Sequence, residues 1–382
     1  MISQEILKQT PLYEEHLRFK ARMVGFGGWD MPLQYEGILA EYEATRRQVT
    51  VFDTCHMGEF LIQGDAHKSG LDRIVTSRLS DMPLKSCRYG TALNPQGGTI
   101  DDLIIYRIAP EDWMIVVNAA TIEKDAAHFL EHLTKQATFT NISFKTGKLD
   151  IQGPVSREIL KEIVPGIQKL DYYTFDYFKV LGENVIVSRT GYTGELGYEI
   201  YFPWERTPDL WREIFKNSKV KPAGLGVRDV LRIEMGYSLY GHELDETISP
   251  LEAGLEKFVD FKKDFIGREA LLAQKKNGVP RKIVYFTSLT RRTPRNGYHI
   301  YTPALQEAGS VTSGTFSPGL QKGIGIGFLS MDGAKSAEDF LLAPPPQLHA
   351  TTQQKAGVGD EKNKIEVRLT KRPFYKSGSL KS

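Results

Sequence analysis

Residues 60–75 read FLIQGDAHKSGLDRIV, and residues 149–164 read LDIQGPVSREILKEIV. Both stretches begin with an apolar run that ends in Ile-Gln-Gly, which predicts a strand followed by a turn. Both then place apolar residues three and four positions apart, which predicts a helix. The similarity indicates that one strand–turn–helix unit occurs twice in the chain. A chance likeness between ordinary strand–helix units is the alternative interpretation.

A second element repeats further along each copy. Residues 113–118 (WMIVVN) predict a strand that leads to a helix at 123–135. Residues 198–202 (YEIYF) predict a strand that leads to a helix opened by Thr207-Pro208, where proline suits the first helical turn. A β-α-β-β-α-β unit present twice gives this spacing, with two sheets each covered by helices. We therefore expect an α+β fold that contains two related ferredoxin-like α/β lobes.

The C-terminal part of the chain predicts a different domain, because its short β-like stretches alternate with glycine, proline and asparagine, as in a small antiparallel barrel. These stretches are KIVYFTSL (282–289), GYHIYT (297–302), GIGIGFLS (323–330) and NKIEVRLT (363–370). The polar residues 274–282 (QKKNGVPRK) predict a linker before it. Residues 342–362, which contain three consecutive prolines, predict a long exposed hairpin loop. We expect two domains, residues 1–273 with both lobes and residues 280–376 as a C-terminal antiparallel β-barrel.

Composition excludes several classes of protein. The chain has 382 residues with 49 Lys plus Arg and 47 Asp plus Glu, a net charge of +2, whereas nucleic-acid binders carry a clustered basic excess. No apolar run approaches the roughly 18 residues of a membrane span, and the opening MISQEILKQT lacks the features of a signal peptide. We therefore expect a cytoplasmic protein that binds neither nucleic acid nor a membrane.

Cysteine and histidine usage argues against a metal site. Cys55 and Cys87 are too few for a disulfide framework or a thiolate metal site. The eight histidines are scattered and form no HxH or HExxH cluster. We expect both cysteines to be reduced and the protein to bind no metal.

Two adjacent carboxylates, Asp101 and Asp102, introduce a strongly apolar strand in GGTIDDLIIYR (97–107). Neighbouring side chains on a strand face opposite ways, so we expect one carboxylate to point to solvent and the other into whatever the sheet covers. In the structural interpretation, both carboxylates simply end the turn. In the functional interpretation, a buried carboxylate awaits a cationic or N–H-bearing ligand, because an unpaired buried charge is costly.

Two further charged residues lie in unusual positions. Glu199 falls within an otherwise apolar strand, and Tyr192 lies in the glycine-rich turn before it. Arg228 lies at the start of a predicted helix, where a positive charge opposes the helix dipole and needs another stabilising partner. A salt bridge to Asp229 or Glu234 is the structural interpretation.

Asp102, Glu199 and Arg228 could line one cleft. They would supply two acceptors for N–H groups and a guanidinium for an anionic or carbonyl group, which suits a heterocycle rich in N–H donors. The tyrosines near these motifs either stack on such a ring or pack in the core and rim in the ordinary way. These tyrosines are Tyr89, Tyr106, Tyr192 and Tyr237.

With these motifs in place, the sequence resembles the aminomethyltransferase (T-protein) family of the glycine cleavage system. The matching stretches run along nearly the whole chain and include VFDTCHMGEF (51–60), GGTIDDLIIYR (97–107), SRTGYTGELGYE (188–199) and PAGLGVRDVLRIEMGYSLYGHELDE (222–246). The resemblance implies a three-lobed ring, in which two related α/β lobes and a C-terminal barrel surround a central tetrahydrofolate site. It also implies that residues 1–273 form the tetrahydrofolate-binding aminomethyltransferase domain.

The resemblance implies a folate-dependent transfer of one carbon, without a metal. Lipoylated H-protein would deliver an aminomethyl group, and tetrahydrofolate would take its methylene carbon, giving 5,10-methylenetetrahydrofolate, ammonia and the reduced lipoyl arm. The catalytic aspartate of the family corresponds to Asp102, which is expected to polarise the N10–H region while N5 attacks. Glu199 corresponds to the glutamate that reads the pterin N–H edge, and Arg228 to an arginine of the folate site. The pocket lining implied by the resemblance is Met57, Tyr89, Tyr106, Val117, Asn118, Tyr192 and Tyr237.

Three alternatives remain open at this stage. A sulfonium demethylase within the same fold would need a different pocket for its methyl donor. A relative that assists iron–sulfur assembly carries a cysteine in the turn where this chain has Gly191, Tyr192 and Thr193, so its absence argues against that function. A folate-binding module without catalysis belongs to another class, and the presence of Asp102 favours the enzyme over it.

Overall fold

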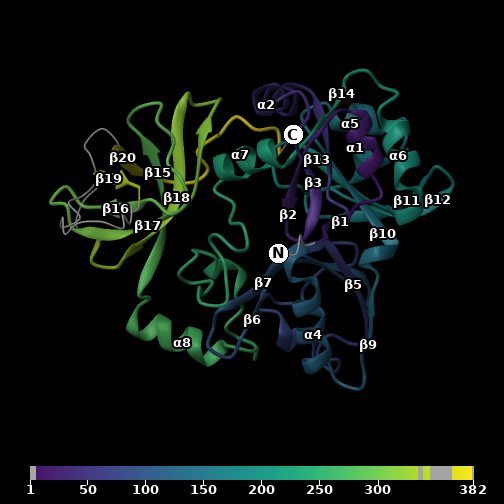
Figure 1. Ribbon diagram of the computed structural model, residues 1–382. Helices are drawn as coiled ribbons and strands as arrows, with labels where there is room; N and C mark the ends of the chain where they lie inside the picture. Colours follow the sequence, from purple (N-terminus) through teal and green to yellow (C-terminus); the bar gives the residue numbers. More distant parts are fainter. Residues whose placement is uncertain (1–5, 334–338, 345–363, 381–382) are drawn as a thin grey trace.

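The computed structural model describes residues 6–333, 339–344 and 364–380. Figure 1 shows three lobes around a common centre, with the barrel on the left, a first α/β lobe below and a second α/β lobe at the upper right. This arrangement confirms the fold class expected from the sequence.

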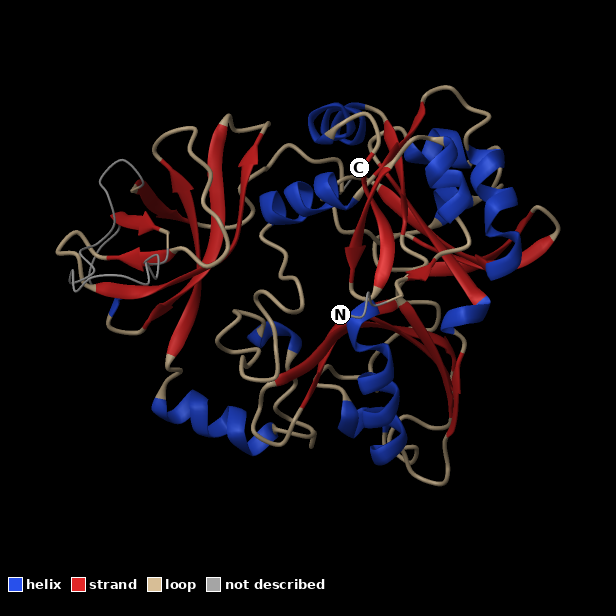
Figure 2. Cartoon of the chain, viewed as in Figure 1, coloured by secondary structure: helices blue, strands red, loops and turns tan. Residues whose placement is uncertain are grey.

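The first lobe is a five-stranded antiparallel sheet with helices against one face (Figure 2). Its elements are β5 (Gly58–Gln63), α3 (Leu71–Ile74), β6 (Cys87–Leu93), β7 (Thr99–Ala109), β8 (Asp112–Val117), α4 (Ile122–His132) and β9 (Thr138–Asn141). The strand order is β6-β7-β8-β5-β9. Phe60 and Ile62 of β5 pack with Phe129 of α4 in the core of the lobe, whereas Leu61 packs on the opposite face. This alternation follows from the period of two in a strand.

The second lobe repeats the same series of elements. They are β10 (Thr146–Gln152), α5 (Ser156–Leu160), β11 (Phe175–Val180), β12 (Glu183–Ser188), β13 (Gly197–Pro203), α6 (Thr207–Ile214) and β14 (Val220–Ala223). The sheet order is β11-β12-β13-β10-β4-β14, with β4 (Val49–Asp53) inserted from earlier in the chain. The repeat inferred from residues 60–75 and 149–164 is therefore confirmed, and a chance likeness is excluded.

Each copy carries one strand more between its two helices than the β-α-β-β-α-β pattern predicts. The additional strand is β6 in the first lobe and β11 in the second. The β6 sequence, CRYGTAL, mixes a charged residue and a glycine with few apolar side chains, so it lacks the alternation that predicts a strand.

The remaining elements before the barrel connect the lobes. They are β1 (Lys8–Gln9), α1 (Tyr13–Arg18), β2 (Arg22–Phe26), β3 (Trp29–Gln34), α2 (Ile38–Arg47), α7 (Leu225–Met235) and α8 (Arg268–Asn277). The helices α2 and α7 pack together against Phe52 of β4, through Tyr42, Val227 and Leu231 among others. Helix α7 lies between the second lobe and the barrel (Figure 1). In the ranges that the structure describes, no helix is long and apolar enough to cross a membrane.

The C-terminal lobe is a closed six-stranded barrel in the order β15-β18-β17-β16-β19-β20. Its strands are β15 (Arg281–Ser288), β16 (His299–Tyr301), β17 (Glu307–Ser317), β18 (Lys322–Ser330), β19 (Asp339–Ala343) and β20 (Ile365–Thr370). The four predicted strand regions are confirmed, and β17 and β19 are additional. The hairpin loop predicted at 342–362 lies mostly outside the described residues.

The prediction of a linker at residues 274–282 is wrong. Helix α8 continues to Asn277 and β15 begins at Arg281, so only three residues connect them. The polar residues that suggested a linker are Gln and Lys on the last turn of an exposed helix, and both residue types favour helices.

The two α/β sheets face each other with the faces that carry no helices. The layer between them contains side chains from both lobes, including Tyr106 and Met114 of the first lobe and Phe175, Ile186 and Tyr201 of the second. The strands that meet in this layer are therefore covered on both faces. On these strands, the residues that alternate with the core residues of each lobe point into the layer between the lobes. Charged residues at such positions therefore lie between the lobes, where they form the site.

Candidate active site

The two adjacent aspartates of β7 hold the same asparagine. Asp102 accepts hydrogen bonds from Asn118 Nδ2 at 2.9 Å and from Tyr89 OH at 3.0 Å. Asp101 accepts from Asn118 Nδ2 at 2.8 Å, from Asn118 N at 2.9 Å and from Thr121 Oγ1 at 3.0 Å. The two carboxylates differ in exposure: Asp101 is 0% exposed, because the turn that leads into α4 covers it, whereas Asp102 is half-buried. The carboxylate expected to point to solvent is therefore only partly exposed.

A third buried aspartate lies against this pair. Asp125 of α4 is 1% exposed, and neither of its oxygens has a hydrogen-bond donor. Burial and the neighbouring charge of Asp101 raise the pKa of Asp125 to about 10, so it keeps its proton and can donate to Asp101. Burial, and then the charge of Asp101, raises the pKa of Asp102 to about 7. Asp102 is therefore able to gain or lose a proton near neutral pH.

Glu199 is held at both oxygens. Lys148 Nζ lies 2.6 Å from Glu199 Oε1, and Thr190 Oγ1 donates to Oε2. Burial raises the pKa of Glu199, but the ammonium of Lys148, the hydrogen bond from Thr190 and the charge of Arg228 together outweigh burial, so the pKa lies below its ordinary value. Lys148 also donates to Met57 Sδ at 3.4 Å, which places Met57 beside this ion pair.

Arg228 lies in the first part of α7 and pairs across the lobe. Its Nη1 donates to Asp150 Oδ2 of β10 at 2.7 Å, and its guanidinium lies 5.0 Å from the ring centroid of Tyr192. The expected alternative, a salt bridge to Asp229 or Glu234, is wrong. Asp229 instead pairs with another arginine of α7, and Glu234 pairs with an arginine of α2.

The glycine-rich turn before β13 places Tyr192. Its ring stacks on Tyr237 with a centroid distance of 5.5 Å and an interplanar angle of 23°. The turn packs directly against Gln152, because a Cβ at Gly191 or Gly197 would lie within 2.3 Å of the Gln152 amide nitrogen. These two glycines therefore allow the turn to approach the Gln152 side chain closely.

The structure brings most of the predicted site residues into one neighbourhood between the lobes and α7. The charge of Asp102 acts to raise the pKa of Tyr89 and of Tyr192. The charge of Arg228 acts to lower the pKa of Tyr192 and of Glu199. Tyr106 and Val117 are placed differently, since both are 0% exposed. Tyr106 lies inside the layer between the sheets, and Val117 ends β8 in the core of the first lobe.

Several residues of this neighbourhood were not identified from the sequence. Lys148 and Asp150 alternate with Leu149 and Ile151 on β10, and this alternation was the available signal. Burial raises the pKa of Asp150 to about 6, although Arg228 opposes this effect.

Two further buried groups near Lys148 were not predicted from the sequence. Glu59 is 0% exposed, and no donor reaches either of its oxygens; burial raises its pKa well above the ordinary value. Burial lowers the pKa of His56 to about 4, and no partner reaches its Nδ1. His56 is therefore neutral at pH 7. In the part of the chain that the structure describes, no three His, Cys, Asp or Glu residues gather in a way that could hold a metal ion.

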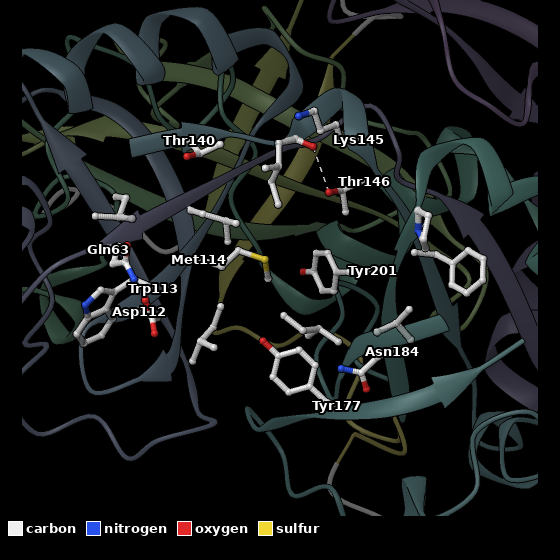
Figure 3. A pocket seen from close by; sticks show the side chains of 18 of the residues that line it. Gln63, Asp112, Trp113, Met114, Thr140, Lys145, Thr146, Tyr177, Asn184 and Tyr201 are labelled. Carbon is white, nitrogen blue, oxygen red and sulfur yellow. Dashed lines mark hydrogen bonds between the residues drawn. The ribbon is translucent and has the colours of Figure 1, made fainter. Parts of the chain in front are cut away.

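A cavity of about 640 Å³ opens at another part of the gap between the lobes (Figure 3). Its walls include Met114 and Trp113 of the first lobe and Tyr177, Asn184 and Tyr201 of the second. None of the ten site residues expected from the sequence lines this cavity.

Comparison with known proteins identifies the class first. Residues 12–263 match the family model described as the GCVT N-terminal domain, and residues 281–376 match the glycine cleavage T-protein C-terminal barrel domain. The chain is an enzyme of the transferase class. It belongs to the glycine cleavage T-protein family and has the function of an aminomethyltransferase in glycine cleavage.

Similar proteins cover almost the whole chain. The aminomethyltransferase of Pseudothermotoga lettingae is 41% identical over 381 residues, which cover 98% of this chain and 100% of the relative. The aminomethyltransferase of Thermotoga maritima is 38% identical and covers 98% of this chain and 99% of its own. The crystal structure of glycine cleavage system aminomethyltransferase T from Bartonella henselae superposes with a TM-score of 0.87 at 27% identity, covering 98% of this chain and 99% of that one.

Proposed function

We propose that this protein transfers the methylene carbon of an aminomethyl group, carried on the lipoyl arm of H-protein, to tetrahydrofolate. The products are 5,10-methylenetetrahydrofolate, ammonia and the reduced lipoyl arm. The observation that supports this proposal best is a pair of carboxyl groups in one neighbourhood that differ in protonation. Asp102 titrates near pH 7, whereas Glu199 is held ionised by Lys148.

The reaction fixes what the site must do with protons. The methylene carbon loses its bonds to sulfur and to the amine nitrogen, and it gains bonds to N5 and N10 of the folate. The protons of N5 and N10 end on ammonia and on the released thiol, so none is consumed from solvent. A carboxyl with a pKa near 7 accepts a proton and returns it at neutral pH, and we assign this role to Asp102. Its charge also stabilises a transient iminium cation.

The groups around Asp102 suit a pterin. An ionised Glu199 accepts hydrogen bonds from pterin N–H groups, and the Arg228 guanidinium donates to a carbonyl or an anion. The stacked pair Tyr192 and Tyr237 offers an aromatic face. Glu59 lies close enough to feel the charges of Lys148 and Glu199, and its oxygens lack donors, which a donor-rich heterocycle would supply.

We also propose a domain division at residues 1–273 and 280–376. The first domain would bind tetrahydrofolate, and the second would form the barrel. The limits of the two family models support this division.

The proposed function is tested by mixing the purified protein with aminomethylated H-protein and tetrahydrofolate. We expect 5,10-methylenetetrahydrofolate and ammonia to form in equal amounts, and only when both substrates are present. Folate binding without product would favour a non-catalytic folate-binding module. Absence of folate binding would overturn the proposal.

A further inference from the structure

A line of four hydroxyl groups ends on the carboxylate of Glu199. Thr190 Oγ1 donates to Glu199 Oε2, and Ser188 Oγ lies 2.6 Å from Thr190 Oγ1. Tyr106 OH lies 3.1 Å from Ser188 Oγ and 2.8 Å from Tyr201 OH. The contacts are continuous from Tyr201 to Glu199. The four residues that carry the hydroxyls are between 0% and 5% exposed.

The direction of these hydrogen bonds follows from proton counting. Each hydroxyl carries one proton, and an ionised carboxylate only accepts. Because Thr190 gives its proton to Glu199, Ser188 must donate to Thr190. By the same argument, Tyr106 donates to Ser188 and Tyr201 donates to Tyr106. All four O–H dipoles therefore point toward Glu199, and hydrogen bonds aligned in this way strengthen one another.

The line of hydroxyl groups connects both lobes to one carboxylate. Tyr106 comes from β7 of the first lobe, whereas Ser188 and Tyr201 come from β12 and β13 of the second. The other oxygen of Glu199 is held by Lys148, whose Nζ lies 5.6 Å from the ring centroid of Tyr201. Glu199 is therefore restrained on both sides. The far end of the chain, Tyr201, lies at the wall of the cavity in Figure 3, which none of the expected folate-site residues lines.

We propose that Tyr201, Tyr106 and Ser188 are positioning residues for Glu199. The line of hydroxyls fixes the orientation of the Glu199 carboxylate toward the pterin, and Tyr201 and Ser188 thereby set the affinity for tetrahydrofolate without touching it. This inference rests on the proposed function, because that function assigns Glu199 to the folate.

The experiment compares hydroxyl deletions by calorimetric titration with tetrahydrofolate. Tyr201→Phe keeps the ring and removes the last hydroxyl, and we expect the Kd to rise about five-fold. Ser188→Ala interrupts the chain nearer to Glu199, and we expect a rise of about ten-fold. Turnover at saturating tetrahydrofolate stays within about two-fold of the wild type for Tyr201→Phe, since Asp102 is untouched.

A matched control lies on the same strand. Tyr198 is 0% exposed, and its hydroxyl accepts a hydrogen bond from Arg157 Nε at 3.0 Å, but it faces the helices of its own lobe. We expect Tyr198→Phe to lower the Tm as Tyr201→Phe does and to leave the Kd unchanged. An unchanged Kd in Tyr201→Phe, or equal shifts in both tyrosine variants, would overturn the inference.

Failure of the proposed function is a separate outcome. If the wild type binds no tetrahydrofolate, the proposed function fails. The line of hydroxyl groups is then tested without ligand. A double-mutant cycle of Tyr201→Phe with Glu199→Gln measures their coupling in urea unfolding. Non-additive free energies of unfolding would support the hydroxyl chain, and additive ones would exclude it.

Discussion

Three aspartates meet where β7 faces the start of α4, and burial raises the pKa of each of them. Asp101 is engaged by the backbone N–H and the side-chain amide of Asn118. Asp125 has no other donor and keeps its proton beside Asp101, because two adjacent buried carboxyls do not both ionise. Asp102 has a pKa of about 7, so the residue that the sequence motif indicated is able to exchange a proton near neutral pH.

Replacing Asp102 by asparagine separates binding from catalysis. The amide has the same shape, and its oxygen can accept from Asn118 while its NH2 group donates to the hydroxyl of Tyr89, so we expect the Kd for tetrahydrofolate to change by less than about three-fold. It cannot take up a proton, and loss of a general acid–base group reduces turnover about 10²- to 10⁴-fold. Titration with tetrahydrofolate and the steady-state rate with H-protein measure the two effects.

Asp112→Asn is the matched control for this prediction. Asp112 lies at the start of β8 in the same lobe and lines the outer cavity of Figure 3. Its substitution is expected to leave both the Kd and the turnover unchanged. Near-normal turnover in Asp102→Asn would remove the catalytic assignment.

The raised pKa of Asp102 also predicts how stability depends on pH. The ordinary pKa is 3.8 and the folded value is about 7, so between these values the native state holds a proton that the unfolded state has lost. Stability therefore falls as the pH rises through this window. In thermal unfolding between pH 5 and pH 8, we expect the Tm of Asp102→Asn to fall by less than the Tm of the wild type. A parallel loss in both proteins would contradict the raised pKa.

At the scale of elements, one arginine holds two helices and a turn together. Arg46 of α2 pairs with Glu234 of α7 at 2.6 Å and with Glu195, in the turn before β13, at 2.7 Å. Tyr42 OH donates to the same Glu234 at 2.9 Å. The three charged side chains are at most 4% exposed, so water cannot replace a missing partner.

We predict that Arg46→Met destabilises the protein by about 3–5 kcal/mol, because it leaves two buried carboxylates without their cation. The control is Arg47→Met on the same helix, since Arg47 and its partner Glu43 are 76% and 44% exposed. An exposed pair of this kind contributes less than about 1 kcal/mol. Urea unfolding of both variants measures the difference, and equal effects would contradict the prediction.

The elements that the sequence predicted are those whose signal is local. Strand β18 and helix α6 follow from apolar spacing and turn residues, and the repeat of β5 and β10 follows from their similar sequences. Strand β6 was missed because its sequence lacks alternation. The boundary at α8 was misplaced because polar residues suit an exposed helix as well as a linker.

The site was predicted less completely, because contacts between residues far apart in the sequence leave no local signal. Asp102, Glu199 and Arg228 were identified by motif, and the structure places them in one neighbourhood. Lys148 and Asp150 were not predicted, since their partners, Glu199 on the neighbouring strand and Arg228 on α7, are distant in the sequence. Asp101 is covered by the turn that leads into α4, and Asp102 is half-buried, so neither aspartate is as exposed as the strand pattern predicts.

At the scale of the whole molecule, the C-terminal tail joins the barrel to the second lobe. After β20 the chain crosses α7, where the backbone N–H groups of Phe374 and Tyr375 donate to Glu234 O. It then reaches the turn before β13, where Ser379 donates through N and Oγ to Glu195 Oε2, and Leu196 N donates to Ser379 Oγ at 2.9 Å. This turn leads into the strand that carries Glu199, so the tail restrains the site from outside.

The tail contact is testable by hydrogen exchange. Ser379→Ala removes the acceptor of the Leu196 amide, and we expect that amide to exchange about ten-fold faster, a change of about 1.4 kcal/mol in the opening free energy. Ser377→Ala is the same substitution at an exposed position two residues earlier and is expected to leave the rate unchanged. If the Leu196 amide exchanges at the same rate in both variants, its protection does not depend on the Ser379 hydroxyl. The tail would then lie on the second lobe without restraining it.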